Sequence, residues 1–220
     1  MKKVAVVLSG CGFLDGSEIT EAVSTLIALS EYGAEATCFA PNLEISAAGY
    51  LDHIGRGSAQ VSIRNVLVES SRISRGVIQD LTSFREADFD AVVFPGGFGA
   101  AKVLSNWMPQ GATAKVLPEV AAIIREFHRS AKPIGALCIA PVLLACVLGK
   151  EGINITIGND SATAQEIEKT GAHHVRCEAT DFVSDRDHKI LTTPAYMIEA
   201  KPHEVFRGIS KLIRELVEMA

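Results

Sequence analysis

The feature that most constrains the fold is the alternation of short apolar segments with segments of helical periodicity. The apolar or β-branched segments lie at residues 4–8, 36–39, 91–94, 134–137, 153–157 and 190–193. Strands that are buried on both faces have this unbroken pattern. Between them, apolar residues recur at helical spacing over 19–30, 63–73, 120–127, 139–148 and 205–216. The alternation predicts an α/β fold with a mostly parallel sheet and helices on both faces.

The size and composition favour one domain. The chain has 220 residues, of which 48% are hydrophobic and 21% charged, so it can bury a sizeable core. The segment from residue 41 to 62 has weak periodicity and several Gly and Ser residues. We interpret that segment as an excursion beside the sheet, so that residues 1–220 form a single domain.

Charge and cysteine content exclude several classes of protein. The net charge of −5 and the lack of a Lys/Arg-rich stripe argue against a nucleic-acid partner. No stretch approaches the roughly 20 apolar residues of a membrane helix, so no membrane association is predicted. The five cysteines have irregular spacings, which fits reduced thiols better than a disulfide framework. A cytoplasmic protein is the simplest prediction.

Cys138 lies where a predicted strand passes directly into a predicted helix. A residue at such a turn can be raised above the sheet, as nucleophiles are on elbow turns. Pro141 suits the first turn of the helix that follows. We expect the helix N-terminus to lower the pKa of the thiol and the Ile139 N–H to help to hold an oxyanion. The alternative is a buried structural cysteine.

Two glycine-containing loops also follow predicted strands, at residues 95–99 and 9–12. Gly96 and Gly97 can expose backbone N–H groups to an anion, although the lysine of a phosphate-binding loop is absent. A simple tight turn is the competing interpretation. Cys11 is either a second reactive thiol among the substrate-binding residues or, as we favour, a packed loop cysteine. Carboxyl ends of parallel strands share one edge of the sheet, so these loops are expected beside Cys138.

Two carboxylates open the first predicted helix. Glu18 and Glu21 both suit the positive end of the helix dipole. A helical wheel places Glu21 nearly opposite the apolar stripe of Ile19, Val23 and Ile27. The pattern alone therefore predicts that Glu21 lies on a solvated face.

Other polar residues have plain explanations. Arg64 and Asn65 begin the second predicted helix, where Asn65 is either a helix cap or a substrate-binding residue. His173 and His174 lie near Cys177 but lack a second cluster of ligands, so no metal site is predicted. The residues by themselves thus give an α/β sheet, a cysteine elbow and no clear base.

The cysteine turn and the Pro-Gly-Gly loop together resemble the ThiJ/PfpI superfamily, which is related to class I glutamine amidotransferase domains. Six blocks extend the resemblance over nearly the whole chain, at residues 7–12, 15–19, 64–67, 94–102, 138–141 and 192–197. They are similar to a branch described as glyoxalases and as isoprenoid-biosynthesis proteins with an amidotransferase-like domain. The resemblance implies a flavodoxin-like three-layer sandwich with a nucleophile elbow, no cofactor, and a homodimer as a reasonable assembly.

The resemblance also implies roles for particular residues. Cys138 corresponds to the nucleophile, and Glu21 to the carboxylate of the first helix that hydrogen-bonds the thiol. The N–H groups of Gly97 and Ile139 correspond to the oxyanion donors. One position departs from the pattern: many members carry a histidine on the next strand, where this chain has Gly158. The usual Cys–His activation is therefore missing.

Three functions follow from the resemblance. The favoured one is a cofactor-independent glyoxalase, a lyase that converts the small dicarbonyl glyoxal, or methylglyoxal, to glycolate or lactate. It would act through a hemithioacetal on Cys138 with Glu21 as base, and turnover would be slow. The alternative is a non-enzymatic redox-sensing or regulatory protein linked to isoprenoid biosynthesis. A glutaminase is disfavoured because the catalytic histidine is absent.

Overall fold

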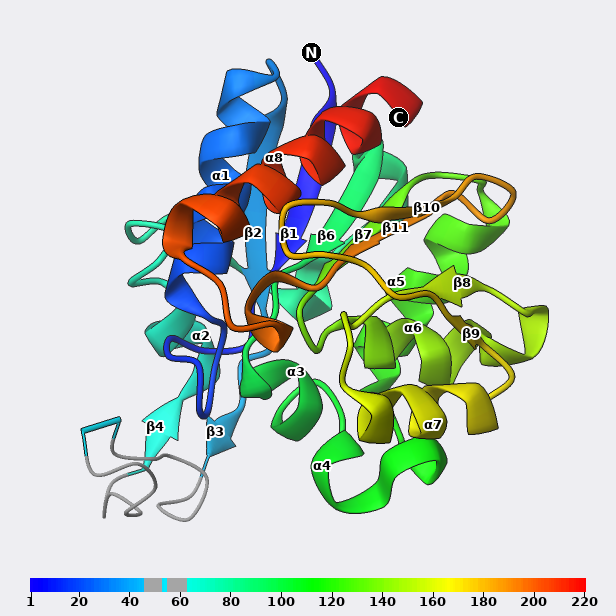
Figure 1. The fold of residues 1–220 in the computed structure, drawn as a ribbon. Coiled ribbons are helices and arrows are strands. Elements are labelled where there is room, and N and C mark those ends of the chain that lie inside the picture. Colours follow the sequence, from blue (N-terminus) through cyan, green and yellow to red (C-terminus); the bar gives the residue numbers. More distant parts are fainter. Residues whose placement is uncertain (46–52, 55–62) are drawn as a thin grey trace.

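The computed structural model describes residues 1–45, 53–54 and 63–220 and shows one central sheet between layers of helices (Figure 1). The strands of this sheet run in the order β10-β11-β7-β6-β1-β2-β5. Their bounds are β1 Lys3–Val7, β2 Glu35–Ala40, β5 Gln79–Asp80, β6 Ala91–Phe94, β7 Ile134–Leu137, β10 Val183–Asp185 and β11 Ile190–Thr193. Neighbouring strands pair in parallel, except β10 with β11. The predicted α/β class and mostly parallel sheet are confirmed.

The helices cover both faces of the sheet because the chain winds outward in two directions. Helix α1 (Ile19–Glu31) links β1 to β2, and α5 (Pro118–Arg129) links β6 to β7 on the other side. Right-handed crossovers in opposite directions place these helices on opposite faces. Helix α8 (Pro202–Met219) packs against α1, and α6 (Pro141–Leu148) packs against α5. The winding reverses between β1 and β6, which is where sites form in such sheets.

The smaller elements lie around this sandwich. They are β3 Glu44–Ile45, β4 Arg64–Asn65, β8 Asn154–Ile155, β9 His173–His174, α2 Val66–Ser70, α3 Phe98–Lys102, α4 Trp107–Gln110 and α7 Ser161–Lys169. Strand β3 pairs with β4, and β8 with β9, in two separate ribbons. The predicted excursion at 41–62 lies mainly outside the described residues.

Two predicted elements are shorter than expected. The strand predicted over 153–157 is wrong in extent, since only β8 forms there and it pairs outside the main sheet. The segment ends in a turn in which the Gly158 N–H donates to Thr156 Oγ1 at 2.9 Å and Gly158 has a φ of +88°. The helix predicted over 63–73 is only α2, because Arg64 and Asn65 form β4 and the chain continues as turns after Ser70.

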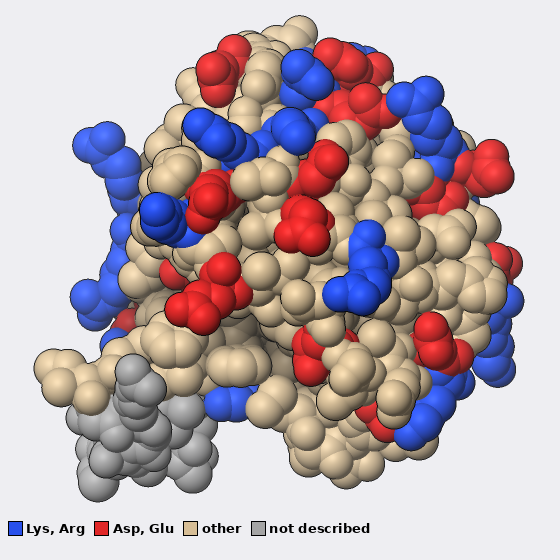
Figure 2. Space-filling view, viewed as in Figure 1, with Lys and Arg blue, Asp and Glu red and all other residues tan. Residues whose placement is uncertain are grey.

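The surface carries mixed charge. Figure 2 shows Lys and Arg side chains interspersed with Asp and Glu on the viewed face. None of the helices in the described part of the chain is both long and apolar enough to cross a bilayer.

The buried face of α1 is opposite to the one that the helical wheel predicts. Ile19, Val23 and Ile27 are 48%, 38% and 52% exposed, whereas Glu21 is fully buried. The face that packs inward is formed mostly of small side chains: Ala22, Ser24, Thr25, Ala28 and Leu29. Small side chains let a helix lie close to its neighbours, so size decides which face is buried here. The prediction of a solvated Glu21 from the wheel is therefore wrong.

This reversal can be tested with a matched pair of truncations on α1. Leu29→Ala removes a fully buried side chain and should cost about 2–5 kcal/mol of unfolding free energy. Ile27→Ala, on the exposed stripe, should change it by about 0.5 kcal/mol or less at low protein concentration. Urea denaturation of both variants measures this, and a larger loss from Ile27→Ala would contradict the observed face.

Candidate active site

Cys138 lies at the turn between β7 and α6, as predicted. Its φ is +57°, a left-handed conformation that is uncommon for a residue with a side chain. The turn is held by the Cys138 N–H, which donates to Thr193 O at 2.9 Å, and Pro141 then opens α6. The side chain is 7% exposed. The strained backbone and the burial are features of a nucleophile elbow.

Glu21 lies beside the thiol with its carboxyl group fully enclosed. The Gly96 N–H donates to Oε2 at 3.0 Å, and the Tyr196 N–H donates to Oε1 at 3.3 Å. The carboxyl group also hydrogen-bonds the Cys138 thiol. A buried polar group needs such partners, since without them its burial is costly. The structure thus brings together the cysteine and carboxylate that the resemblance to the superfamily implied.

Two positions in the loop after β6 require glycine, because a side chain there would overlap the residues packed around Cys138 and Glu21. A Cβ on Gly96 would lie 2.3 Å from Cys138 Cβ and 2.5 Å from Glu21 Oε2. Gly97 has a φ of +93°, and a Cβ there would lie 2.3 Å from Gly16 O. The N–H groups of Gly97 and Ile139 both donate hydrogen bonds to the Cys138 sulfur. Gly96, Gly97 and Ile139 therefore surround the thiol as predicted.

Burial dominates the acid–base behaviour of the pair. It raises the pKa of Glu21 to about 8, and the charge of Glu18 adds to this shift. Burial raises the pKa of Cys138 most, and the charge of Glu21 raises it further. The hydrogen bonds from the N–H groups of Gly97 and Ile139 lower this pKa, but by less. The expectation that the helix N-terminus lowers this pKa is wrong, because desolvation outweighs the dipole. The pair thus keeps at least one proton at neutral pH.

A cavity of about 410 Å³ opens above the thiol. It is lined by Phe13, Glu18, Gly97, Phe98, Cys138, Ile139, Tyr196 and Met197. Sequence reasoning did not single out the aromatic residues or Met197. Tyr196 and Met197 follow β11, which pairs with β7, so the carboxyl end of β11 was the signal for them. Glu18 caps α1, accepting from the Glu21 N–H at 2.6 Å.

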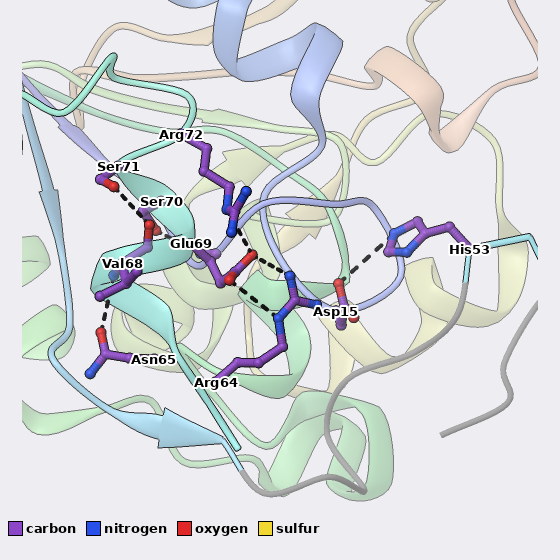
Figure 3. A network of polar contacts seen from close by, with 10 residues as sticks. Asp15, His53, Arg64, Asn65, Val68, Glu69, Ser70, Ser71 and Arg72 are labelled. Atoms are coloured by element: carbon purple, nitrogen blue, oxygen red, sulfur yellow. Dashed lines mark hydrogen bonds and ion pairs between the residues drawn. The ribbon is translucent and has the colours of Figure 1, made fainter. Parts of the chain in front are cut away.

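Asn65 and Cys11 are not among the residues that line the cavity. Asn65 caps α2, with its Oδ1 accepting from the Val68 N–H at 3.0 Å (Figure 3). In the same view, Arg64 and Arg72 converge on Glu69. Cys11 is half-buried near these charges, and burial is the main cause that raises its pKa. These placements fit the capping role for Asn65 and the packed-loop interpretation for Cys11.

Among the described residues, no histidine lines the cavity. His53 packs edge-on against Phe13, with ring centroids 5.3 Å apart, but does not itself line the cavity. The superfamily histidine position is filled by other groups: a Cβ on Gly158 would lie 2.8 Å from Ile198 Cγ1 and 3.1 Å from Pro194 Cβ. The described part of the chain also holds no cluster of His, Cys, Asp and Glu suited to a metal ion.

Known proteins of one family are similar to this chain in sequence and fold. The sequence matches the DJ-1/PfpI family over residues 2–195. It is 42% identical over 226 aligned residues to the human protein "Glutamine amidotransferase-like class 1 domain-containing protein 3, mitochondrial", covering 99% of this chain and 83% of that one. It is 32% identical to "ES1 protein, mitochondrial" of Danio rerio, covering 98% and 85%. Both relatives are mitochondrial by name, and a cytoplasmic location for this chain stays a prediction.

Solved structures give the same result. An "isoprenoid biosynthesis protein with amidotransferase-like domain" from Ehrlichia chaffeensis superposes with a TM-score of 0.92 at 37% identity, covering 100% of this chain and 99% of that one. DJ-1beta of Drosophila melanogaster superposes with a TM-score of 0.56 at 17% identity, covering 98% and 91%. The second likeness concerns the fold alone. The flavodoxin-like sandwich predicted from the resemblance is confirmed.

Restoring the missing histidine should not repair the site. Gly158→His introduces a side chain at φ +88° against Ile198 and Pro194, and should cost about 1–3 kcal/mol of stability. We expect no faster alkylation of Cys138 by iodoacetamide. Gly33→His is the matched control, since Gly33 has a φ of +71° and no atom of the described residues lies within 4 Å of an added Cβ. A stable, faster-reacting Gly158→His protein would contradict the steric argument.

The raised pKa of Glu21 makes a prediction for stability against pH. The folded carboxyl group has a pKa of about 8, whereas an unfolded one has a pKa of about 4.3. Between these values only the folded state keeps the proton, so stability is lost as pH rises. Relative to Glu21→Gln, the wild type should lose on the order of 3 kcal/mol from pH 5 to pH 8.

Urea denaturation at several pH values measures this difference. Glu35→Gln, at an exposed residue, is the control and should track the wild type. Stability curves that stay parallel for wild type and Glu21→Gln would show that Glu21 ionises normally.

Proposed function

The chain belongs to the DJ-1/PfpI family, and from that membership we propose that it is a cofactor-independent glyoxalase of the lyase class. It converts a 2-oxoaldehyde, glyoxal in the simplest case and methylglyoxal next, into a 2-hydroxy acid. One observation carries the proposal: Cys138 lines a cavity, the fully buried Glu21 hydrogen-bonds its thiol from behind, and two backbone N–H groups are directed at the sulfur. Thiol, proton carrier and oxyanion donors are the groups that this reaction needs.

The first step is the addition of the thiol to the aldehyde carbon. The Cys138 sulfur forms a bond to that carbon, and the thiol proton passes through Glu21 to the aldehyde oxygen, giving a hemithioacetal. A carboxyl group with a pKa of about 8 can both accept and return a proton near neutral pH. The N–H groups of Gly97 and Ile139 stabilise the negative charge that develops on the oxygen.

The second step moves a hydrogen between the two carbons. Glu21 removes the proton from the former aldehyde carbon, and the resulting enediol is reprotonated at the neighbouring carbon. The first carbon is thereby oxidised to a thioester and the second reduced to an alcohol, so no external oxidant is needed. Water then hydrolyses the thioester, releases the 2-hydroxy acid and restores the thiol. Without a histidine, thiolate formation is unfavourable and turnover is slow.

Two alternatives have less support. An oxidant sensor needs an accessible thiol of low pKa, whereas Cys138 is 7% exposed and its pKa is raised. A glutaminase activates its cysteine with histidine, and no described histidine lines this cavity. A link to isoprenoid biosynthesis rests only on the printed name of the Ehrlichia protein.

The proposal is tested by glycolate formation from glyoxal. Cys138→Ser should lower kcat/KM by about a hundredfold or more, because a hydroxyl group is a far weaker nucleophile than a thiol. Cys146→Ser is the matched control: Cys146 is a half-buried thiol on α6 that does not line the cavity, and its replacement should leave the rate unchanged. Equal glycolate formation by the wild type and Cys138→Ser would overturn the proposal.

A further inference from the structure

The cavity above Cys138 is larger and more apolar than glyoxal requires. Its volume of about 410 Å³ falls within the roughly 300–1,000 Å³ typical of pockets for larger organic ligands. Glyoxal consists of two carbons and two oxygens and would leave most of this space to water. A ligand that fills the cavity must carry a substituent beyond its two carbonyl groups.

The walls of the cavity indicate the chemistry of that substituent. Phe13, Phe98 and Met197 present apolar side chains, and Tyr196 adds a ring. Phe13 is 47% exposed, so a bound apolar group would remove part of its ring from water, which is favourable. The Phe98 N–H donates to Phe13 O at 2.7 Å, and His53 packs against the Phe13 ring. Phe13 is therefore held in place as a wall.

The charge of the cavity indicates which ligands it excludes. Among the described residues that line it, Glu18 is the one with a charged side chain. The Lys102 ammonium group lies 5.3 Å from the centroid of the Phe98 ring and donates to Leu14 O at 2.8 Å, but Lys102 is not among the lining residues. Arg64 and Arg72 are paired with Glu69 on the α2 side. A carboxylate or phosphate on the substrate would thus meet the Glu18 carboxylate, and the described residues that line the cavity include no cation.

We propose that the substrate class is a neutral 2-oxoaldehyde with an aromatic or bulky apolar substituent, selected by Phe13 and by the charge of Glu18. This inference rests on the glyoxalase function proposed above and specifies its substrate. The aldehyde carbon lies at the Cys138 sulfur, and the substituent lies against the aromatic wall. The reaction balances as before, with a phenyl-substituted 2-oxoaldehyde and water giving mandelate.

The first experiment compares glyoxal, phenylglyoxal and 4-carboxyphenylglyoxal as substrates. The 2-hydroxy acid products are measured, because phenylglyoxal also condenses with arginine side chains, and the Cys138→Ser rate is subtracted. We expect kcat/KM for phenylglyoxal to exceed that for glyoxal by about tenfold or more, as burial of an apolar ring predicts. The carboxylated analogue should fall below phenylglyoxal by a similar factor. A Cys138-dependent rate that is equal or higher with glyoxal overturns the inference and leaves the proposed function standing.

Two variants test whether Phe13 and Glu18 determine the substrate preference. Phe13→Ala should lower kcat/KM for phenylglyoxal at least about fivefold more than that for glyoxal, mainly through KM. Glu18→Gln keeps an oxygen that can cap α1 but removes the charge, and should raise the ratio of 4-carboxyphenylglyoxal to phenylglyoxal turnover. Val77→Ala, at a 79% exposed residue outside the cavity, is the control and should change neither ratio. Unchanged ratios in both cavity variants overturn the assignment.

A second readout does not depend on turnover. Acetophenone, a neutral aromatic ketone that lacks the aldehyde, should slow the alkylation of Cys138 by iodoacetamide, whereas benzoate at the same concentration should not. Phe13→Ala should weaken the protection by acetophenone. Protection of Cys138 by acetophenone without any turnover of 2-oxoaldehydes would refute the glyoxalase function. It would still support the preference of the cavity for neutral aromatic ligands. Absence of protection by acetophenone, or equal protection by benzoate, overturns the inference.

Discussion

The active site depends on one buried carboxyl group. Glu21 comes from α1, yet its two oxygens accept N–H groups from Gly96, after β6, and from Tyr196, after β11. The same carboxyl group meets the thiol of Cys138, after β7. One side chain therefore ties the ends of three neighbouring strands to a helix. Burying a carboxyl group is costly unless its partners are in place, so the geometry of the site and the burial of Glu21 require each other.

The close approach of these segments depends on the absence of side chains in the loop after β6. A Cβ on Gly96 would overlap both Cys138 and Glu21, and one on Gly99 would lie 2.2 Å from Ser9 Oγ. The loops after β1 and β6 are thus packed backbone to backbone, as the Gly99 N–H to Gly16 O bond of 2.9 Å shows. The glycines of the 95–99 loop allow this close packing, and the loop also directs the Gly97 N–H at the Cys138 sulfur.

Sequence patterns identify strands and turns that are determined by neighbouring residues. They fail for features that are determined by packing between distant segments. The strands β6 and β7 and the elbow at Cys138 are marked by apolar runs that end at special residues, and the structure places them there. The sequence pattern does not predict which face of α1 is buried, because the buried face consists of small side chains. Ala22 and Ala28 are buried, whereas Ile27 is exposed. Glu21 is identified only through the resemblance to the superfamily. The cavity walls depend on β11 lying beside β7, which no local pattern gives.

The missing histidine and the apolar cavity have one structural origin. The segment from Pro194 to Ile198 fills the space that a side chain on Gly158 would need. The same segment supplies the Tyr196 N–H to Glu21 and places Tyr196 and Met197 in the cavity wall. The segment that blocks a side chain on Gly158 thus also forms part of the apolar cavity wall and binds the carboxyl group of Glu21. If the proposed function holds, proton transfer falls to Glu21, and the apolar wall of Phe13, Tyr196 and Met197 orients the substrate.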